Sequence, residues 1–417
     1  MLKRFVAIVV MSALTMGVIF YTRDYKRELM VEEQKQEVTK EDELSEEKSF
    51  DIWYEYNGYE AYLKYVAEEF TKETGIKVKL LCISDLGYAS LINESSIKGE
   101  GPDLYVSGTS ILENLYLSGI VSVIEDTDVV NEKNYAKKAI EGVSYGDKLC
   151  GYPLGYDVSV LAYNANHISV EPKTFEDIKA YIGNEEGVET NFEGISKVFE
   201  MESEDLLYNY GFFSEYMKIE KDAKTGKLTV SLNSENTKSA ATQYVALKDY
   251  FGLSNETKDY SSIVADFAAG KTLFAILNTS IVGNAAFAEL NYNVMPMPDF
   301  SDTVKISAMS YTEMIIVNPY TDSMNEAVKF AKMAAFDLAD KMYEKCGILS
   351  ARKGIDYGKP VADRFFVAYE ESMALPKYME TEDFALLAKN TINHIWKGQD
   401  IVTVLNELQE TYELKNK

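Results

Sequence analysis

The sequence has few of the residues that build metal centres and disulfide frameworks. Its 417 residues include 2 histidines, 3 cysteines and 8 prolines. His167 and His394 are too few for a histidine-rich metal site. Cys82, Cys150 and Cys346 lack CxxC spacing and lie among apolar neighbours, so we expect buried thiols and no disulfide. The composition therefore predicts a protein with no metal and no cofactor.

Positive charge is also scarce. The chain has 42 Lys and Arg against 67 Asp and Glu, which gives a net charge of -25. Nucleic-acid phosphates are bound by clustered basic side chains, so a nucleic-acid partner is excluded. With 46% hydrophobic and 12% aromatic residues, the composition is that of a globular protein long enough for two domains.

Two short stretches resemble catalytic motifs but lie in the wrong context. Residues 142–146 match GxSxG around Ser144, yet a helix-like segment precedes the serine where a nucleophile elbow needs a strand. Gly270-Lys271-Thr272 resembles the end of a phosphate loop, but Ala265 stands where the first glycine belongs. We expect no enzymatic activity from either stretch.

The N-terminal residues predict a location outside the cytoplasm. Lys3 and Arg4 precede an apolar run that lacks a clear cleavage site, so residues 1–22 are expected to be a signal peptide or a membrane anchor. Residues 23–49 are rich in Glu and Lys and have almost no side chains for a core. We expect them to be a flexible tether that holds a folded body near the cytoplasmic membrane.

The body opens with a pattern typical of parallel α/β sheets. A strand is expected over residues 49–57, then a helix with Tyr62, Val66 and Phe70 on one face, then a strand over 76–83. Gly75 occupies the position that ends the helix. A strand, a helix and a second strand in this order favour a parallel sheet.

Small polar residues follow further predicted strands. Residues 104–108 lead through Ser107 toward a helix whose start has capping-box spacing between Ser110 and Glu113. Residues 271–277 lead through Asn278 and Ser280 into a helix expected over 281–290. Open α/β sheets bind ligands at such strand ends, although these residues could also serve only as helix caps.

The rest of the chain supplies a turn, a long extended run and C-terminal helices. Residues 145–148 predict a hairpin turn, and residues 149–164 an extended run that crosses between domains. Residues 325–336, 384–396 and 401–412 each carry an apolar helical face, and Gly398 separates the last two.

Several segments, in order, resemble the bacterial extracellular solute-binding proteins of ABC importers, above all their maltose- and carbohydrate-binding members. They are YVAEEFTKETGIKVKL, GEGPDLYVSG, YLSGIVSVI, YGDKLCGYPLGYDVSVLAYN, PKTFEDI, YSSIVADFAAGKTLFAILN, NYNVMPMP and WKGQDIVTVLNEL. Together they span nearly all of the body from Phe50 on.

This resemblance implies a two-lobed α/β fold with a hinge, of the periplasmic-binding-protein type. The N-terminal lobe would comprise residues 50–156 and 302–353, and the C-terminal lobe residues 157–301 and 354–417. It implies a monomeric receptor without catalysis that binds a small solute, a sugar above all, and docks on the transmembrane permease subunits of an ABC importer.

The resemblance also implies site positions, of which few keep the family's residue types. The ligand-binding acid after the Tyr-Pro crossing falls on Asp157. Two stacking tryptophans fall on Ser107 and Ser280, and a polar pair on Ser110 and Ile111. The remaining positions, which in the family are an Asp-Lys pair, an aromatic pair and an arginine, fall on Tyr56, Asn57, Ala385, Leu386 and Lys389.

Tyrosines could replace the missing tryptophan faces, because sugars bind aromatic faces together with planar polar groups. Tyr54, Tyr56, Tyr156 and Tyr311 are the candidates among 30 tyrosines. Asp157 would accept hydrogen bonds from solute hydroxyls or pair with a cationic group. A receptor for a cationic or peptide solute, a surface enzyme such as a glycosidase, and a sensor without transport are the alternative hypotheses.

Overall fold

The computed structural model describes residues 49–84, 87–182, 192, 194–222, 225–374, 376–377 and 384–415. From Phe50 on, the chain forms one compact unit. Within the described ranges no helix is long and apolar enough to cross a membrane. The anchor expected over residues 1–22 and nearly all of the expected tether lie outside these ranges.

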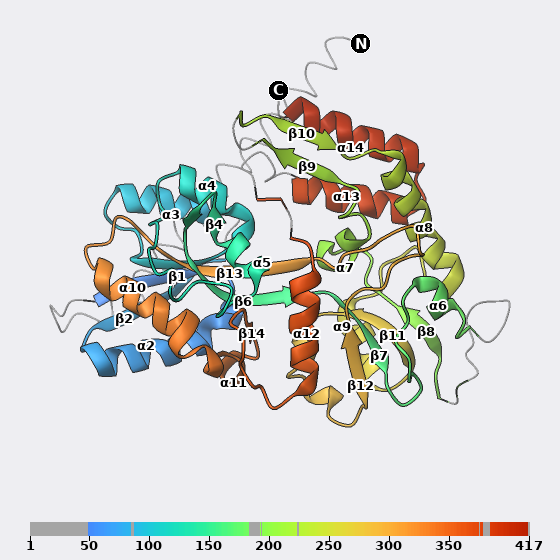
Figure 1. Ribbon diagram of the computed structural model, residues 1–417, viewed down its shortest axis with the longest axis horizontal. Coiled ribbons are helices and arrows are strands. Elements are labelled where there is room, and N and C mark those ends of the chain that lie inside the picture. The colour runs from blue at the N-terminus through green and yellow to red at the C-terminus, as the bar shows by residue number, and fades with distance from the viewer. Residues whose placement is uncertain are drawn as a thin grey trace, which may run out of the picture. The chain divides into compact units, whose positions relative to one another are not determined.

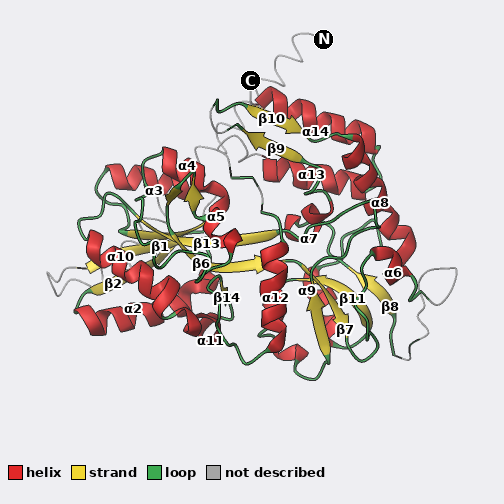
Figure 2. Ribbon diagram, viewed as in Figure 1, coloured by secondary structure: helices red, strands yellow, loops and turns green. Residues whose placement is uncertain are grey.

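The first sheet has six strands in the order β14-β6-β13-β3-β1-β2. Strand β1 runs parallel to β3, with Ile52 opposite Leu104, whereas β13 runs antiparallel to both β3 and β6. Helices lie on both sides of these strands (Figure 2). The strands are β1 (Ser49–Tyr54), β2 (Lys77–Cys82), β3 (Leu104–Gly108), β6 (Tyr152–Val158), β13 (Ser310–Val317) and β14 (Leu349–Ser350).

Helix α2 (Glu60–Thr74) covers this sheet with the apolar face that its sequence predicts, and it ends at Gly75, whose φ is 77°. Phe50 of β1, Phe70 of α2 and Phe330 of α10 (Met324–Lys332) pack edge to face with ring centroids 5.2 to 5.8 Å apart. Further helices are α3 (Tyr88–Ile97), α4 (Leu112–Leu117), α5 (Lys137–Gly142), α11 (Met342–Cys346) and α12 (Pro360–Glu371).

The second sheet has four strands in the order β12-β7-β11-β8. In Figure 1 it lies apart from the first sheet, and α12 stands between them. Its strands are β7 (Val160–Asn164), β8 (Lys197–Glu200), β11 (Thr272–Leu277) and β12 (Tyr292–Met295). Around it are α6 (Phe175–Lys179), α7 (Leu206–Asn209), α8 (Glu235–Phe251), α9 (Tyr260–Ala268), α13 (Phe384–Trp396) and α14 (Ile401–Lys415).

Two hairpins complete the strands. The predicted turn at residues 145–148 is confirmed: it joins β4 (Ser144–Tyr145) to β5 (Lys148–Leu149) through Gly146, whose φ is 61°. Strands β9 (Lys218–Lys221) and β10 (Leu228–Ser231) form the second hairpin.

Three chain segments connect the two sheets side by side. Between β6 and β7 the amide of Ser159 donates to the Met309 carbonyl at 3.1 Å. Before β13, the Ala308 carbonyl accepts from the amide of Met373, and the amide of Ser310 donates to the Met373 carbonyl, at 2.7 and 2.8 Å. These contacts join the segments into a short ribbon. The lobe boundaries expected from the sequence remain a proposal.

Two local features predicted from the sequence are contradicted by the structure. The structure has no capping box at Ser110 and Glu113, because a 3-10 turn, η2 (Thr109–Ile111), precedes α4 and neither start has a side-chain cap. In place of a helix over residues 281–290 there are two 3-10 turns, η4 (Thr279–Ile281) and η5 (Ala285–Phe287). Asn278 and Asn284 each bond the amide two residues ahead, which favours separate turns.

The remaining short turns are η1 (Asn57–Tyr59), η3 (Tyr210–Phe212), η7 (Ala339–Lys341) and a π-helical turn, η6 (Met333–Asp337).

Candidate functional site

The candidate site begins at one edge of the first sheet. Strand β6 ends near Asp157, and antiparallel β13 begins beside it, with Tyr311 opposite Asp157. Two residues further along β13, Glu313 lies opposite Gly108, the last residue of β3. The strand ends therefore gather polar and aromatic side chains at a single edge, as the sequence pattern predicts for α/β sheets.

Three cavities of about 470, 680 and 630 Å³ meet at this edge, and Glu313 lines all three. Tyr311 is shared by the first and third, Tyr56 by the second and third, and Ser110 by the first and second. Because these neighbouring cavities share lining residues, we call the three together the central cleft. The third cavity is also lined by Asn278, Thr279 and Ser280, which follow β11 of the second sheet.

The carboxylate of Asp157 in β6 binds the segment that follows β11 at the third cavity. Its Oδ1 accepts from the amide and hydroxyl of Thr279, at 3.1 and 2.7 Å, and from the amide of Val158 at 2.8 Å. Its Oδ2 accepts from Nδ2 of Asn278 at 2.8 Å. Burial raises the pKa of Asp157 despite these donors. The carboxylate thus binds the protein itself, and Oδ2 retains room for a further donor.

Asn278 extends this hydrogen-bond network to Ser280 and Tyr260. Its Oδ1 accepts from the hydroxyls of Ser280 and Tyr260, at 2.6 and 2.8 Å. The Tyr260 ring stacks on Tyr208 with centroids 4.8 Å apart. The polar groups at the end of β11 are therefore held in fixed orientations before any solute arrives.

Two tyrosines offer open ring faces in the central cleft. Tyr56 is 58% exposed and Tyr311 is 36% exposed. Tyr156 differs, because it is 3% exposed and stacks on Tyr369 with centroids 4.2 Å apart. Tyr156 lines the third cavity, and its buried hydroxyl has no hydrogen-bond partner among the described residues.

Two glutamates that line the cleft, Glu313 and Glu55, were not predicted as site residues from the sequence. Burial raises the pKa of Glu313 to about 7, and the neighbouring charge of Asp157 adds to the shift, while a hydrogen bond from Tyr59 opposes it. Burial and the charge of Glu313 likewise raise the pKa of Glu55 to about 7. The available signal was a charged residue inside the apolar strand SYTEMIIV, at a position where core strands carry hydrophobic side chains.

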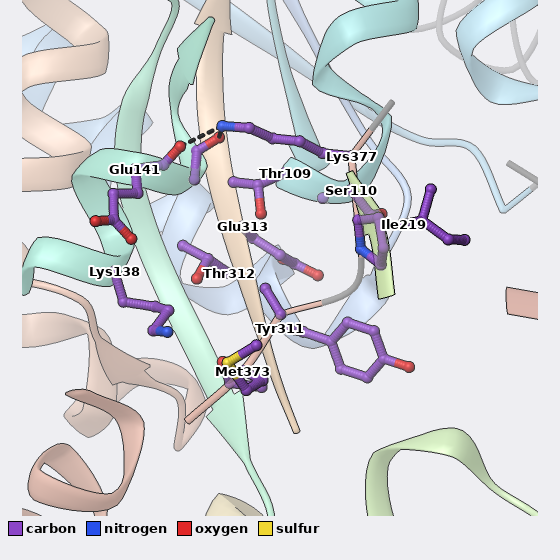
Figure 3. A pocket seen from close by; sticks show the side chains of 15 residues that line it. Thr109, Ser110, Lys138, Glu141, Ile219, Tyr311, Thr312, Glu313, Met373 and Lys377 are labelled. Carbon is purple, nitrogen blue, oxygen red and sulfur yellow. Dashed lines mark hydrogen bonds between the residues drawn. The ribbon is translucent and has the colours of Figure 1, made fainter. Parts of the chain in front are cut away.

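The first cavity is lined by side chains of β13 and of segments outside the sheet. Figure 3 shows Thr109, Thr312 and Glu313 gathered at its middle. The ammonium of Lys377 donates to the backbone carbonyls of Glu141 and Gly142 (Figure 3) and to that of Ser144. Burial lowers the pKa of Lys377.

The predicted site residues divide into three groups by position. Those that line the cleft are Asp157, Tyr156, Tyr56, Ser110, Asn278, Ser280 and Tyr311. Ser107 is 2% exposed within β3, and its hydroxyl lacks a partner in the described part of the chain. Asn57 begins η1 and Lys389 lies within α13, and neither lines the three cavities.

The described part of the chain shows no candidate metal-binding cluster, and Cys346 lines the third cavity. Over the described ranges, no group of three or more His, Cys, Asp and Glu side chains is arranged to hold a metal ion. All three cysteines are free thiols; Cys150 is buried, and Cys82 and Cys346 are half-buried. The cleft therefore offers hydrogen bonds, ring faces and carboxylates to a ligand.

Comparison with known sequences gives a match to the family described as bacterial extracellular solute-binding protein, over residues 65–364. The chain is 22% identical over 378 residues to the maltodextrin-binding protein MdxE of Bacillus subtilis (strain 168), covering 85% of this chain and 89% of that protein. It is also 22% identical to the maltooligosaccharide ABC transporter solute-binding lipoprotein of Streptococcus pneumoniae (strain ATCC BAA-255 / R6), covering 86% and 88%.

Solved structures show the same fold. A cyclo/maltodextrin-binding protein complexed with maltotetraose superposes with a TM-score of 0.74 at 19% identity, covering 90% of this chain and 99% of that one. An extracellular solute-binding protein from Staphylococcus aureus in complex with maltose gives 0.73 at 18% identity, covering 89% and 98%. The expected two-lobed α/β fold is thus confirmed.

Proposed function

Because the chain belongs to the family of bacterial extracellular solute-binding proteins, we propose that its central cleft binds a carbohydrate and delivers it to an ABC importer permease. The observation that carries the proposal is the central cleft where the first sheet ends, whose third cavity is also lined by residues 278–280, next to the second sheet. Relatives named for maltodextrin and maltooligosaccharide binding support a sugar as the solute.

The chemistry of the cleft suits a sugar. Tyr56 and Tyr311 present open ring faces on which a pyranose can pack. Ser110 and Asn284 line the same space with groups that donate and accept hydrogen bonds. Few polar groups placed among aromatic walls are typical of sites for small polar ligands.

Binding and delivery would be coupled through lobe closure. A solute that contacts both the β13 edge and residues 278–280 binds the closed arrangement better than an open one. The ribbon of three segments at Ser159, Met309 and Met373 is the hinge for this motion. The permease subunits would then recognise the closed form.

The rest of the proposal concerns location and assembly. Residues 1–22 would anchor the protein or direct its export, and residues 23–49 would tether the body outside the cytoplasmic membrane. The receptor would act as a monomer and without catalysis. The lobes would be residues 50–156 with 302–353, and 157–301 with 354–417.

Calorimetric titration of the full chain with maltodextrins, other oligosaccharides and their monomers tests this function. We expect saturable binding without hydrolysis of the sugar. Tyr311→Ala should weaken binding by about tenfold through lost ring contact. The control is Tyr320→Ala, whose ring is 53% exposed and lies outside the three cavities. Sugar turnover, or equal affinities for both variants, would contradict the proposal.

A further inference from the structure

Glu55 and Glu313 lie in the same cavity without a cationic partner. Both line the 680 Å³ cavity, whose described lining includes no lysine, arginine or histidine. Glu55 is affected electrostatically by Glu313, and Glu313 by Asp157, while no basic group acts on either. Two partly buried carboxylates that repel each other are costly unless a proton or a cation joins them.

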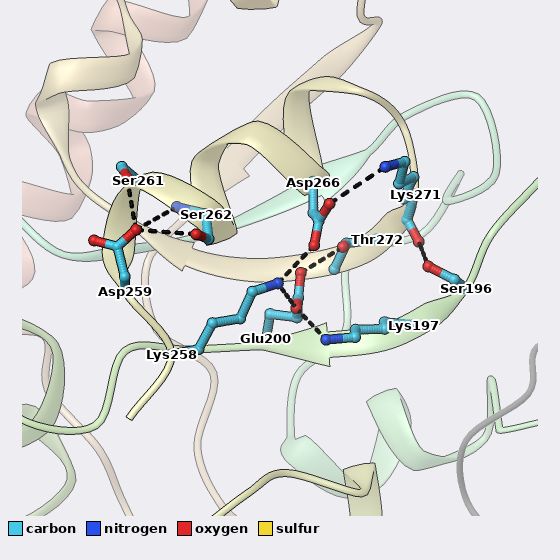
Figure 4. A network of polar contacts seen from close by, with 10 residues as sticks. All are labelled: Ser196, Lys197, Glu200, Lys258, Asp259, Ser261, Ser262, Asp266, Lys271 and Thr272. Carbon is cyan, nitrogen blue, oxygen red and sulfur yellow. Dashed lines mark hydrogen bonds and ion pairs between the residues drawn. The ribbon is translucent and has the colours of Figure 1, made fainter. Parts of the chain in front are cut away.

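Elsewhere this chain neutralises a buried carboxylate with its own lysines. Glu200 of β8 is 1% exposed, and its Oε1 lies 2.5 Å from Nζ of Lys258 and 2.6 Å from Nζ of Lys197 (Figure 4). Its Oε2 accepts from the hydroxyl of Thr272 at 2.7 Å. Glu200 is therefore neutralised within the fold, whereas Glu313 receives a hydrogen bond from Tyr59 and no basic group acts on it or on Glu55.

Unpartnered atoms in the same cavity point independently to a ligand. Tyr88 is 2% exposed and lines the cavity, and its hydroxyl has no hydrogen-bond partner within the described residues. Oε2 of Glu313 is shielded from solvent and equally lacks a partner. Buried polar atoms are nearly always paired, so these two groups indicate a missing hydrogen-bond partner.

We propose that the solute is an amino-substituted saccharide whose ammonium group binds between Glu55 and Glu313. This inference rests on the proposed carbohydrate-binding function and names the chemical class of its solute. An ammonium carries three donors and no acceptor, which matches two carboxylates and the free hydroxyl of Tyr88. Tyr56, which lines the same cavity, offers the ring face for the sugar.

A neutral sugar bound above a protonated carboxyl pair is the competing arrangement. In that case a glutamine, which is nearly isosteric with a protonated glutamate, should serve as well as the native residue. With a bound ammonium, glutamine loses the charge that the cation needs. Charge-assisted hydrogen bonds are the strong ones, so the two arrangements predict clearly different effects of the same substitution.

The test is calorimetric titration of the full chain at pH 7 with glucosamine oligosaccharides, their N-acetylated counterparts and maltodextrins of equal length. We expect the amino form to bind about ten- to a hundredfold more tightly than the N-acetylated form. Glu313→Gln and Glu55→Gln should remove most of this preference. The control is Glu68→Gln, on the exposed face of α2, which should keep it.

The outcomes separate the two proposals. An amino preference that Glu313→Gln abolishes supports both. Binding of neutral sugars with unchanged affinity in Glu313→Gln overturns the amino-saccharide inference and leaves the carbohydrate function standing. If wild type folds, as circular dichroism reports, and binds no saccharide of either kind, the carbohydrate function itself fails and the inference with it.

Discussion

At the scale of single residues, Asp157 of β6 accepts three hydrogen bonds from Asn278 and Thr279, which follow β11, and a fourth from the amide of Val158. Asp157→Asn should lower the free energy of unfolding by about 1–3 kcal/mol, because the new NH2 group meets a donor in either orientation. Denaturant titration of the apo protein measures the change. The exposed turn variant Asp147→Asn is the control and should differ from wild type by less than about 0.5 kcal/mol.

Because it is measured without solute, a stability change in Asp157→Asn would report the structural role of Asp157 alone. The resemblance placed an acid at this position, and the structure shows Asp157 lining the cleft. Its partners Asn278 and Thr279 lie more than a hundred residues away in the sequence. No local pattern reveals such a contact, and so the sequence could indicate the acid but not what it binds.

The pH dependence of stability provides a second test at this scale. Glu55 and Glu313 have pKa values raised to about 7, above the value of roughly 4.3 expected for an unfolded glutamate. The folded state therefore holds protons that the unfolded state releases. The stability from this source is complete below the unfolded pKa and is lost as pH rises through about 7.

Thermal melts of the apo protein at pH 5 and pH 8 measure this effect. The melting temperature should fall toward pH 8, and it should fall less in Glu313→Gln, by about 2 °C or more. Glu68→Gln should behave as wild type, which controls for the general repulsion of an acidic protein. An equal fall in Glu313→Gln would mean that Glu313 does not titrate in this range.

At the scale of elements, the β9–β10 hairpin contacts the first lobe through one ion pair. Nζ of Lys221 lies 3.1 Å from Oε2 of Glu113 on α4, whose side chain is 4% exposed. Lys221→Met would leave this carboxylate without its lysine. We expect a loss of about 1–3 kcal/mol in the free energy of unfolding, discounted because Lys221 is partly exposed.

A matched control exists in the same lobe. Lys238 pairs at 2.8 Å with Glu235, whose side chain is 88% exposed, so Lys238→Met should cost less than about 0.5 kcal/mol. Adding Glu113→Gln to Lys221→Met should recover part of the loss. If the two lysine variants are equally stable, the contact between hairpin and α4 contributes nothing measurable.

Helices and strands with a clear hydrophobic periodicity were predicted well from the sequence. The helices over residues 384–396 and 401–412 and the strand at 104–108 are found with nearly the expected bounds. The segment 281–290 was misread because its apolar residues resemble a helical face. Asn284, which bonds the amide of Ala286, breaks it into turns instead.

At the scale of the whole molecule, the body should fold without its first 49 residues. Residues from Phe50 on form one compact unit with a continuous apolar core. A chain that begins at Phe50 should give the circular dichroism spectrum and cooperative unfolding of a mixed α/β protein. A disordered spectrum would contradict this division of the chain.

The fold was predictable from the sequence at this scale, whereas the solute was not. The order of the family-like segments indicated two lobes. Among the site positions, Asp157 keeps the family's residue type, whereas serines stand where the family has its two tryptophans. Glu55 and Glu313 come together only through the pairing of β1, β3 and β13, which joins residues 258 apart in number. Such a pair carries no signature in a single sequence.

The ribbon at Ser159, Met309 and Met373 limits how the two lobes can move. Three hydrogen-bonded strands bend easily across their length, but they resist sliding past one another and spreading apart. Opening and closing would then follow a single rotation, and a substitution behind the ribbon could make that rotation easier or harder without touching the solute. Selection could thereby adjust how long a sugar stays bound independently of which sugar is chosen.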